Sequence, residues 1–204
     1  MNKNLEHYVF HKKNFLDGKY CENFINEFNK HDWAWEKNFW YSVRSDSLTA
    51  PSRNKKLEHI PEHIFNWSIQ PKNIEKVRNF ASEIMTKLHP VILEYIETFK
   101  FDWFAGWESY SPLKFLRYLP GQTMQNHCDH IHDLFDGERK GVPILSIIGI
   151  LNDDYEGGEL FLFEDKKIDT KKGDLLIFPS NFLYPHKVTP VTKGVRYSYV
   201  SWVW

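Results

Sequence analysis

The residues best suited to chemistry lie in one short segment, His127-Cys128-Asp129. In a strand the side chains alternate, so His127 and Asp129 point to the same face and can bind one metal ion together. With a second histidine from elsewhere in the chain, two imidazoles and one carboxylate would occupy one face of an octahedron and leave three positions open. The chain has ten histidines, however, so an H-x-D triplet alone is as easily a coincidence as a metal site.

The later part of the chain supplies a candidate partner histidine and an anion-binding residue. His186 follows a strand-turn passage at residues 173–179 and precedes Arg196 by ten positions. A guanidinium can bind a carboxylate through two parallel hydrogen bonds, which suits the far end of a dicarboxylate. Ser198 lies two residues further, on the same face of an extended strand, and could donate to the same carboxylate.

Short apolar or alternating runs, separated by Gly, Pro, Asn and Asp, follow Trp103 and must position these residues. We expect strands at residues 113–118, 142–151, 159–164, 174–178, 184–189 and 195–203. No helix-length pattern separates these runs, so a doubly wound parallel sheet fits poorly. The predicted fold is mainly β with α: an eight-stranded double-stranded β-helix, or jelly-roll barrel, supported by N-terminal helices.

The N-terminal half has a helical pattern instead. Apolar residues recur at three- and four-residue steps from Gly18 to Trp33 and again from about Asn73 to Phe99, where Pro90 should kink or divide the helix. Between them we expect a strand at 38–43 and a polar loop at 50–61. We therefore expect residues 1–204 to form a single domain, in which residues 1–100 are helical support with one or two added strands and residues 101–204 are the jelly-roll catalytic core.

Composition narrows the functional classes. Apolar residues make up 42% of the 204 residues, enough for one large core, and the formal net charge is −1, so no positive field exists to hold nucleic acid. Only two cysteines occur, and the N-terminus lacks a long apolar run. We therefore expect a cytoplasmic protein with no nucleic-acid partner and no membrane span, and leave its oligomeric state open.

The C-terminal half also resembles a known family. The resemblance covers about residues 113–204 and is carried by four motifs in order, RYLPGQTMQNHCD (117–129), ILNDDYEGGELFLF (150–163), KKGDLLIFPS (171–180) and HKVTPVTKGVRYSYVSW (186–202). These motifs are similar to those of the prolyl 4-hydroxylase-type branch of the 2-oxoglutarate and Fe(II)-dependent dioxygenases. The resemblance implies Fe(II), 2-oxoglutarate as co-substrate and O2, with ascorbate as a candidate reductant.

The resemblance also assigns roles to single residues. It implies that His127, Asp129 and His186 are the iron ligands, and that Arg196 pairs with the C5 carboxylate of 2-oxoglutarate. It implies further that Tyr118 lies beside the co-substrate and that Trp202 lines the substrate mouth. The chain departs from the family at Met124, where a tyrosine is frequent, and at Gly149-Ile150, where an aromatic pair is frequent. Both departures are expected to alter the pocket wall.

The substrate is the open question. Motif resemblance favours hydroxylation of a prolyl residue in a peptide or protein, with a free amino acid or another small molecule as the alternative within enzymes. A third interpretation, from another class, is an inactive jelly-roll module that binds a metal for structure. Related halogenases lack this carboxylate, so Asp129 favours hydroxylation over halogenation. Related nucleobase demethylases usually carry two arginines on the last strand, where this chain has only Arg196, which argues against demethylation. His130 and His132 are interpreted as residues that line the mouth of the pocket or contact the metal ligands, and Cys128 as a packing residue that points away from the metal.

Overall fold

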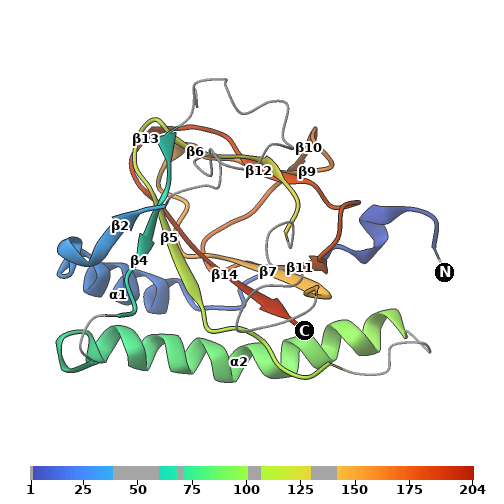
Figure 1. The fold of residues 1–204 in the computed structure, drawn as a ribbon, viewed down its shortest axis with the longest axis horizontal. Coiled ribbons are helices and arrows are strands. Elements are labelled where there is room, and N and C mark those ends of the chain that lie inside the picture. Colours follow the sequence, from blue (N-terminus) through green and yellow to red (C-terminus); the bar gives the residue numbers. More distant parts are fainter. Residues whose placement is uncertain (1, 39–59, 69–70, 101–106, 130–141) are drawn as a thin grey trace, which may run out of the picture.

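A computed structural model describes residues 2–38, 60–68, 71–100, 107–129 and 142–204. Within these ranges the chain forms three layers: two long helices, a large sheet and a smaller sheet (Figure 1). The predicted mainly β architecture with N-terminal helices is confirmed. Apart from Asn38 and Ile60–Pro61, the strand expected at 38–43 and the loop expected at 50–61 lie outside the described residues.

The first helix, α1 (Gly18–Asn29), begins where Asp17 accepts hydrogen bonds from the backbone N–H groups of Lys19 and Tyr20. It ends at Asn29, four residues before the predicted end at Trp33. A 3₁₀ turn (Asp32–Ala34) follows and leaves Trp33 61% exposed. The apolar spacing therefore predicted a helix correctly, but the predicted range also took in a separate 3₁₀ turn.

The second helix, α2 (Glu75–Phe99), continues without a break through Pro90. Pro90 was expected to kink or divide this helix, and the second alternative is wrong. Proline removes one backbone hydrogen bond and crowds the preceding turn, but tertiary packing stabilises most protein helices more than intrinsic propensity does. The buried stripe of α2 supplies that packing on both sides of the proline, through Val77, Ile84, Leu88, Val91, Ile92 and Tyr95.

The large sheet has seven strands, and every neighbouring pair is antiparallel. Their order is β1 (Phe10–Lys12), β11 (Leu175–Pro179), β7 (Leu145–Ile150), β14 (Arg196–Val203), β5 (Lys114–Tyr118), β4 (His63–Phe65) and β2 (Trp35–Lys37). Figure 1 shows α2 running beneath β5, β14 and β7. One face of this sheet is therefore covered by helix.

The smaller sheet faces the other side of the large one. Its order is β10 (Lys166–Ile168), β9 (Leu160–Leu162), β12 (His186–Val188), β6 (Gln122–His127) and β3 (Ile60–Pro61), with β3 parallel to β6 and the other pairs antiparallel. A separate pair joins β8 (Glu156–Gly157) to β13 (Val191–Lys193). Among the described residues, no strand pairing closes the two sheets into one barrel.

All six strands predicted after Trp103 are present, with ends shifted or shortened by up to three residues. The other strands were not among these predictions: the six-residue β6, and the very short β1, β2, β3, β4, β8, β10 and β13, of two or three residues each. A run of this length does not show a period of two. These strands are stabilised by partners distant in sequence.

Two hydrophobic clusters lie on opposite faces of the large sheet, one against the helices and one between the sheets. Strand β5 shows how alternation divides them, since Phe115 belongs to the first cluster and Leu116 and Tyr118 to the second. On β14, Tyr197 and Tyr199 pack toward the helices. The alternate residues of β14, Arg196, Ser198 and Val200, therefore face the space between the sheets.

A search of the helices in the described part of the chain finds none long and apolar enough to cross a membrane.

Candidate metal centre

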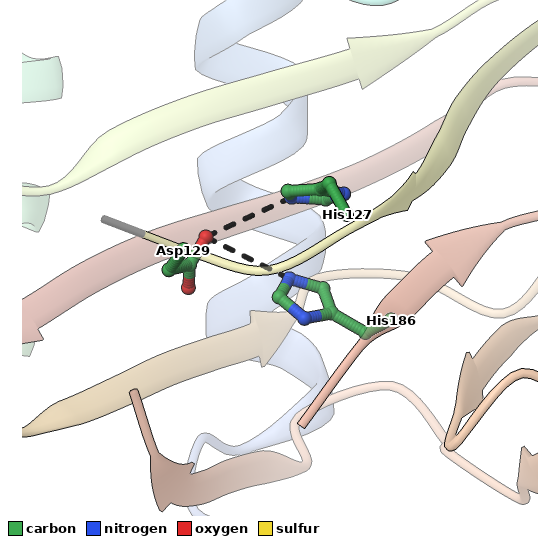
Figure 2. Close-up of side chains that lie close together, drawn as sticks. All are labelled: His127, Asp129 and His186. Carbon is green, nitrogen blue, oxygen red and sulfur yellow. Dashed lines mark ion pairs between the residues drawn. The ribbon is translucent and has the colours of Figure 1, made fainter. Parts of the chain in front are cut away.

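The structure brings His127, Asp129 and His186 together (Figure 2). Nε2 of His127 lies 3.7 Å from Oδ1 of Asp129, and Nε2 of His186 lies 3.8 Å from the same oxygen. One ligand atom from each residue lies within 4.8 Å of the other two. In the described part of the chain, this is the one group of three or more His, Cys, Asp or Glu side chains with such a geometry.

The two imidazoles are placed by strand pairing in the smaller sheet. His127 is the last residue of β6 and His186 the first of β12, and the two are direct cross-strand partners. Opposing side chains in an antiparallel pair lie side by side, and the two ring centroids are 4.3 Å apart. The long sequence separation of the histidines is thus bridged by one step of a β-ladder.

Asp129 is positioned differently from the prediction. We expected strand alternation to align it with His127, but β6 ends at His127 and Asp129 lies two residues beyond it. Its carboxylate instead accepts hydrogen bonds from Ser146 on β7 and Trp202 on β14. The large sheet therefore fixes the carboxylate while the smaller sheet fixes the imidazoles.

Hydrogen bonds to the backbone also orient both imidazoles. Nδ1 of His127 lies 2.8 Å from the carbonyl oxygen of Gln125, and Nδ1 of His186 lies 3.1 Å from that of Tyr184. A carbonyl can only accept, so each Nδ1 donates to it and each Nε2 is the ring nitrogen left to face a metal. Backbone partners of this kind are typical of histidines that bind metals.

Charge states at the centre suit metal binding. Burial, with a smaller contribution from His186, lowers the pKa of His127 to about 4, so this imidazole is neutral at physiological pH. Burial alone would raise the pKa of Asp129. The neighbouring histidines and the hydrogen bonds from Ser146 and Trp202 outweigh it, so the pKa lies below its usual value. The centre thus presents a neutral His127 and an ionised Asp129, the forms in which these side chains bind a divalent metal.

The predicted anion-binding residues lie at the closed end of the same pocket. Arg196, Ser198 and Tyr118 are each 1% exposed. The guanidinium donates to the Ser198 hydroxyl at 2.8 Å and lies 5.0 Å from the centre of the Tyr118 ring. Burial raises the pKa of Tyr118, and the nearby guanidinium offsets part of that rise. Arg196 thus contacts Ser198 and the Tyr118 ring, and no acidic side chain among the described residues forms an ion pair with it.

The residues proposed from the sequence as metal, co-substrate or substrate contacts all line this one pocket: Tyr118, Met124, His127, Asp129, His186, Arg196, Ser198 and Trp202. Met124, 9% exposed, contributes to the wall as expected, and so does Trp202. The expectation for Gly149 is wrong, because a side chain there would point away from the pocket and into the ring of Tyr199, 1.9 Å away. Strand alternation on β7 explains this, since Ile148 next to it does line the pocket.

Two charged residues near the centre were not found from the sequence. Lys114 lines the pocket from the first position of β5, and its spacing from Leu116 and Tyr118 is the signal that would have revealed it. Glu62 is completely buried, accepts a hydrogen bond from Asn38 at 2.6 Å, and its negative charge contributes to the raised pKa of Tyr118. No motif marks Glu62, whose position depends on β4 pairing with β5.

The other residues near the H-x-D segment are the two histidines after it and the cysteine within it. His130 and His132 lie outside the described residues. Cys128 is not part of the ligand group. Its Sγ lies 3.5 Å from the carbonyl oxygen of Phe182, and burial raises the pKa of its thiol, which disfavours the thiolate that a metal would need.

The donor set fits Fe(II) and a carboxylate co-substrate. Two imidazoles and one carboxylate on one side of a metal are typical of non-haem Fe(II) oxygenases, and they leave positions open toward the pocket. The buried guanidinium of Arg196 matches a carboxylate geometrically and electrostatically.

Comparison with known sequences points the same way. Residues 113–204 match the family model of the 2OG-Fe(II) oxygenase superfamily. A PKHD-type hydroxylase of Alteromonas mediterranea is 35% identical over 99 residues, covering 45% of this chain and 42% of the relative. A PKHD-type hydroxylase of Idiomarina loihiensis is 34% identical over 90 residues, covering 43% and 39%. The aligned segments thus span less than half the length of these curated relatives.

Solved structures with a similar fold are prolyl hydroxylases. A Pseudomonas putida prolyl-4-hydroxylase has a TM-score of 0.64 at 21% identity, covering 96% of this chain and 91% of that one. A Trichoplax adhaerens prolyl hydroxylase, solved with a peptide fragment of hypoxia inducible factor, has a TM-score of 0.66 at 18% identity, covering 96% and 83%. The family match implies Fe(II), 2-oxoglutarate and O2. The predicted resemblance is therefore confirmed: residues 113–204 are similar to the 2OG-Fe(II) oxygenase superfamily, and the described fold is similar to that of prolyl hydroxylases.

Proposed function

We propose that this chain is an Fe(II)- and 2-oxoglutarate-dependent dioxygenase that hydroxylates an aliphatic C–H bond. His127, Asp129 and His186 would hold the metal, and Arg196 with Ser198 and Tyr118 would hold the far carboxylate of 2-oxoglutarate. The observation that carries the proposal is the placement in one pocket of a 2-His-1-carboxylate group and of Arg196, which has no acidic partner among the described residues.

The residues around the metal have distinct tasks in such a reaction. Ferrous iron with 2-oxoglutarate and O2 supplies, when bound, an oxidant strong enough to break an unactivated C–H bond. The backbone carbonyls behind both histidines keep the ligand nitrogens aimed at one point. Arg196 sets the orientation of the co-substrate, and the apolar residues Leu116, Ile148 and Leu160 exclude water from the reacting centre.

For the substrate, we propose a prolyl residue in a peptide or protein. This is supported by the prolyl hydroxylases with a similar fold and by the peptide bound in the Trichoplax adhaerens structure. A free amino acid or other small molecule is the alternative within enzymes. An inactive metal-binding module is the alternative from another class, and the open coordination positions argue against it, because a structural metal site closes its shell.

We further propose that the two facing sheets are the halves of a jelly-roll barrel in a single domain. In this arrangement, residues 101–204 form the catalytic core and residues 1–100 support it. The layered packing of α1 and α2 against the large sheet supports this division.

An anaerobic titration with Fe(II) and 2-oxoglutarate tests the chemistry. The chelate of both gives a weak visible charge-transfer band, which we expect in the wild type and in a His89→Ala control, because His89 is exposed and outside the pocket. His186→Ala should not give the band. A wild type without the band would favour the inactive module.

A second experiment separates the substrate classes. Oxygen-dependent succinate release is measured with a panel of proline-containing peptides and with free amino acids. Stimulation by peptides supports the prolyl proposal, whereas stimulation by free amino acids alone supports the alternative.

A further inference from the structure

A second cation lines the pocket at the opposite end from Arg196. Lys114 and Tyr118 lie on the same face of β5, and in the ladder Tyr118 pairs with Arg196 whereas Lys114 pairs with Val200. The two pairs are four residues apart along the strand, which corresponds to about 13 Å. Lys114 and Arg196 thus extend into the pocket from backbone positions at opposite ends of the paired strands.

The two ends of the pocket differ in exposure. The end at Arg196 is closed, with its side chains 1% exposed. Lys114, Val200 and Trp202 are half-buried. Lys114 therefore lies at the open end, where a substrate enters and where the ligand Asp129 is close enough for its charge to act on the lysine.

The Lys114 ammonium has no hydrogen bond and no ion pair with any of the described residues. The carboxylates of Glu62 and Asp129 act on it at longer range. Burial lowers the pKa of Lys114, and these two negative charges offset part of that change. A half-buried cation that lacks a direct partner among the described residues has lost part of its hydration, and a bound anion would offset that loss.

We propose that Lys114 binds a carboxylate of the substrate at the open end of the pocket, beside Trp202. The inference rests on the proposed function and narrows it to substrates that carry a carboxylate near the hydroxylated carbon. That carboxylate is either the α-carboxylate of a free amino acid or the side chain of an acidic residue next to the target residue of a peptide.

Matched acid and amide pairs test this proposal. The probes are free amino acids, including L-proline, with their amides, and proline-containing peptides in which Glu next to proline is replaced by Gln. Binding is followed anaerobically as a perturbation of the Fe(II)–2-oxoglutarate band, so that no turnover is needed. We expect wild type to bind at least one acid about tenfold or more tightly than its amide.

Variants attribute that preference to the lysine. Lys114→Met should reduce the acid preference to about twofold or less, and Lys114→Arg should keep most of it. Lys171→Met is the control, because that side chain is 66% exposed and outside the pocket. The pair that shows the preference, amino acid or peptide, identifies the source of the carboxylate.

The failures are distinguishable. A wild type without the band overturns the proposed function. A wild type with the band but without any acid preference overturns the role of Lys114 alone, as does a preference that survives in Lys114→Met. Loss of the band in Lys114→Met would show that the lysine serves the metal centre instead, which also overturns substrate recognition.

Discussion

The two ends of the pocket, both built by β5 and β14, differ in how their cations are enclosed. At the closed end, Arg196 is completely enclosed and its guanidinium is aligned by Ser198 and Tyr118. At the open end, Lys114 is half-buried and without a direct partner among the described residues. Enclosed donors suit the proposed co-substrate, which is the same molecule in every turnover. A half-buried cation at the open end suits the proposed substrate, whose size and shape can vary.

The metal centre lies between these ends, and removing a ligand should have the largest effect. His127→Ala, Asp129→Ala or His186→Ala should abolish Fe(II) binding, and turnover should be lost even at saturating 2-oxoglutarate and substrate. The reason is that the two remaining ligands are too few to hold the metal. Metal content after gel filtration and succinate release are the measurements. A His127→Ala protein with wild-type activity would remove this residue from the site.

A change at the closed end should affect the co-substrate and not the metal. Arg196→Met should raise the 2-oxoglutarate concentration for half-maximal succinate release by about 10- to 150-fold, the loss expected for hydrogen bonds to a charged group. Arg196→Lys retains one charge and should lose less. Because Arg196 is buried in the fold, thermal unfolding of each variant must be compared with wild type. An unchanged 2-oxoglutarate requirement in a folded Arg196→Met protein would contradict the assignment.

Residues behind Asp129 should have a smaller effect. Ser146→Ala and Trp202→Phe each remove one hydrogen bond to the carboxylate; the first keeps the side-chain volume nearly unchanged, and the second keeps an aromatic ring at the position. Each should weaken Fe(II) binding by about 10- to 100-fold. Competition with a chromophoric chelator measures the affinity, and Ser180→Ala, a buried serine outside the pocket, is the matched control. Equal affinities in all three variants would show that Asp129 needs no support.

The smallest effect on Fe(II) binding is expected at a carboxylate outside the pocket, Asp174. Asp174 accepts hydrogen bonds from the backbone of Asn14 and Lys171 and contacts His11. Burial would raise the pKa of Asp174, but these contacts lower it below its usual value. The stability it provides is therefore complete above about pH 4 and is lost as the pH falls through the lower folded-state pKa.

Asp174→Asn should lower the free energy of unfolding by about 1–3 kcal/mol at neutral pH. The difference from wild type should shrink as the pH falls below 4, as measured by urea unfolding at several pH values. A difference that is independent of pH would show that the charge of Asp174 is not involved. Fe(II) affinity should be unchanged.

The sequence predicted the parts of this molecule that depend on local patterns. Alternating apolar residues between turns predicted β5, β7, β9, β11, β12 and β14, and motif spacing predicted the ligands and Arg196. Short strands such as β1 were missed, because three residues pair only through distant contacts such as His11 with Asp174. Glu62 was missed for the same reason, since its burial beside the pocket follows from the pairing of β4 with β5.

Asp129 is an instructive intermediate case. Its proximity to His127 was predicted, but the reason was wrong. The carboxylate is aligned by Ser146 and Trp202, which come from strands far apart in sequence. A motif can thus identify a ligand without revealing what holds it, because the supporting contacts are tertiary.

The cross-strand pairing of His127 with His186 gives the centre a built-in protection against misfolding. β12 is hydrogen-bonded on both sides, with His186 opposite His127 on one neighbour and opposite Leu162 on the other. A slip by one residue would turn one imidazole to the far face of the sheet, and it would have to break both ladders at once. A chain that has reached its native strand register has therefore already assembled two of its three ligands.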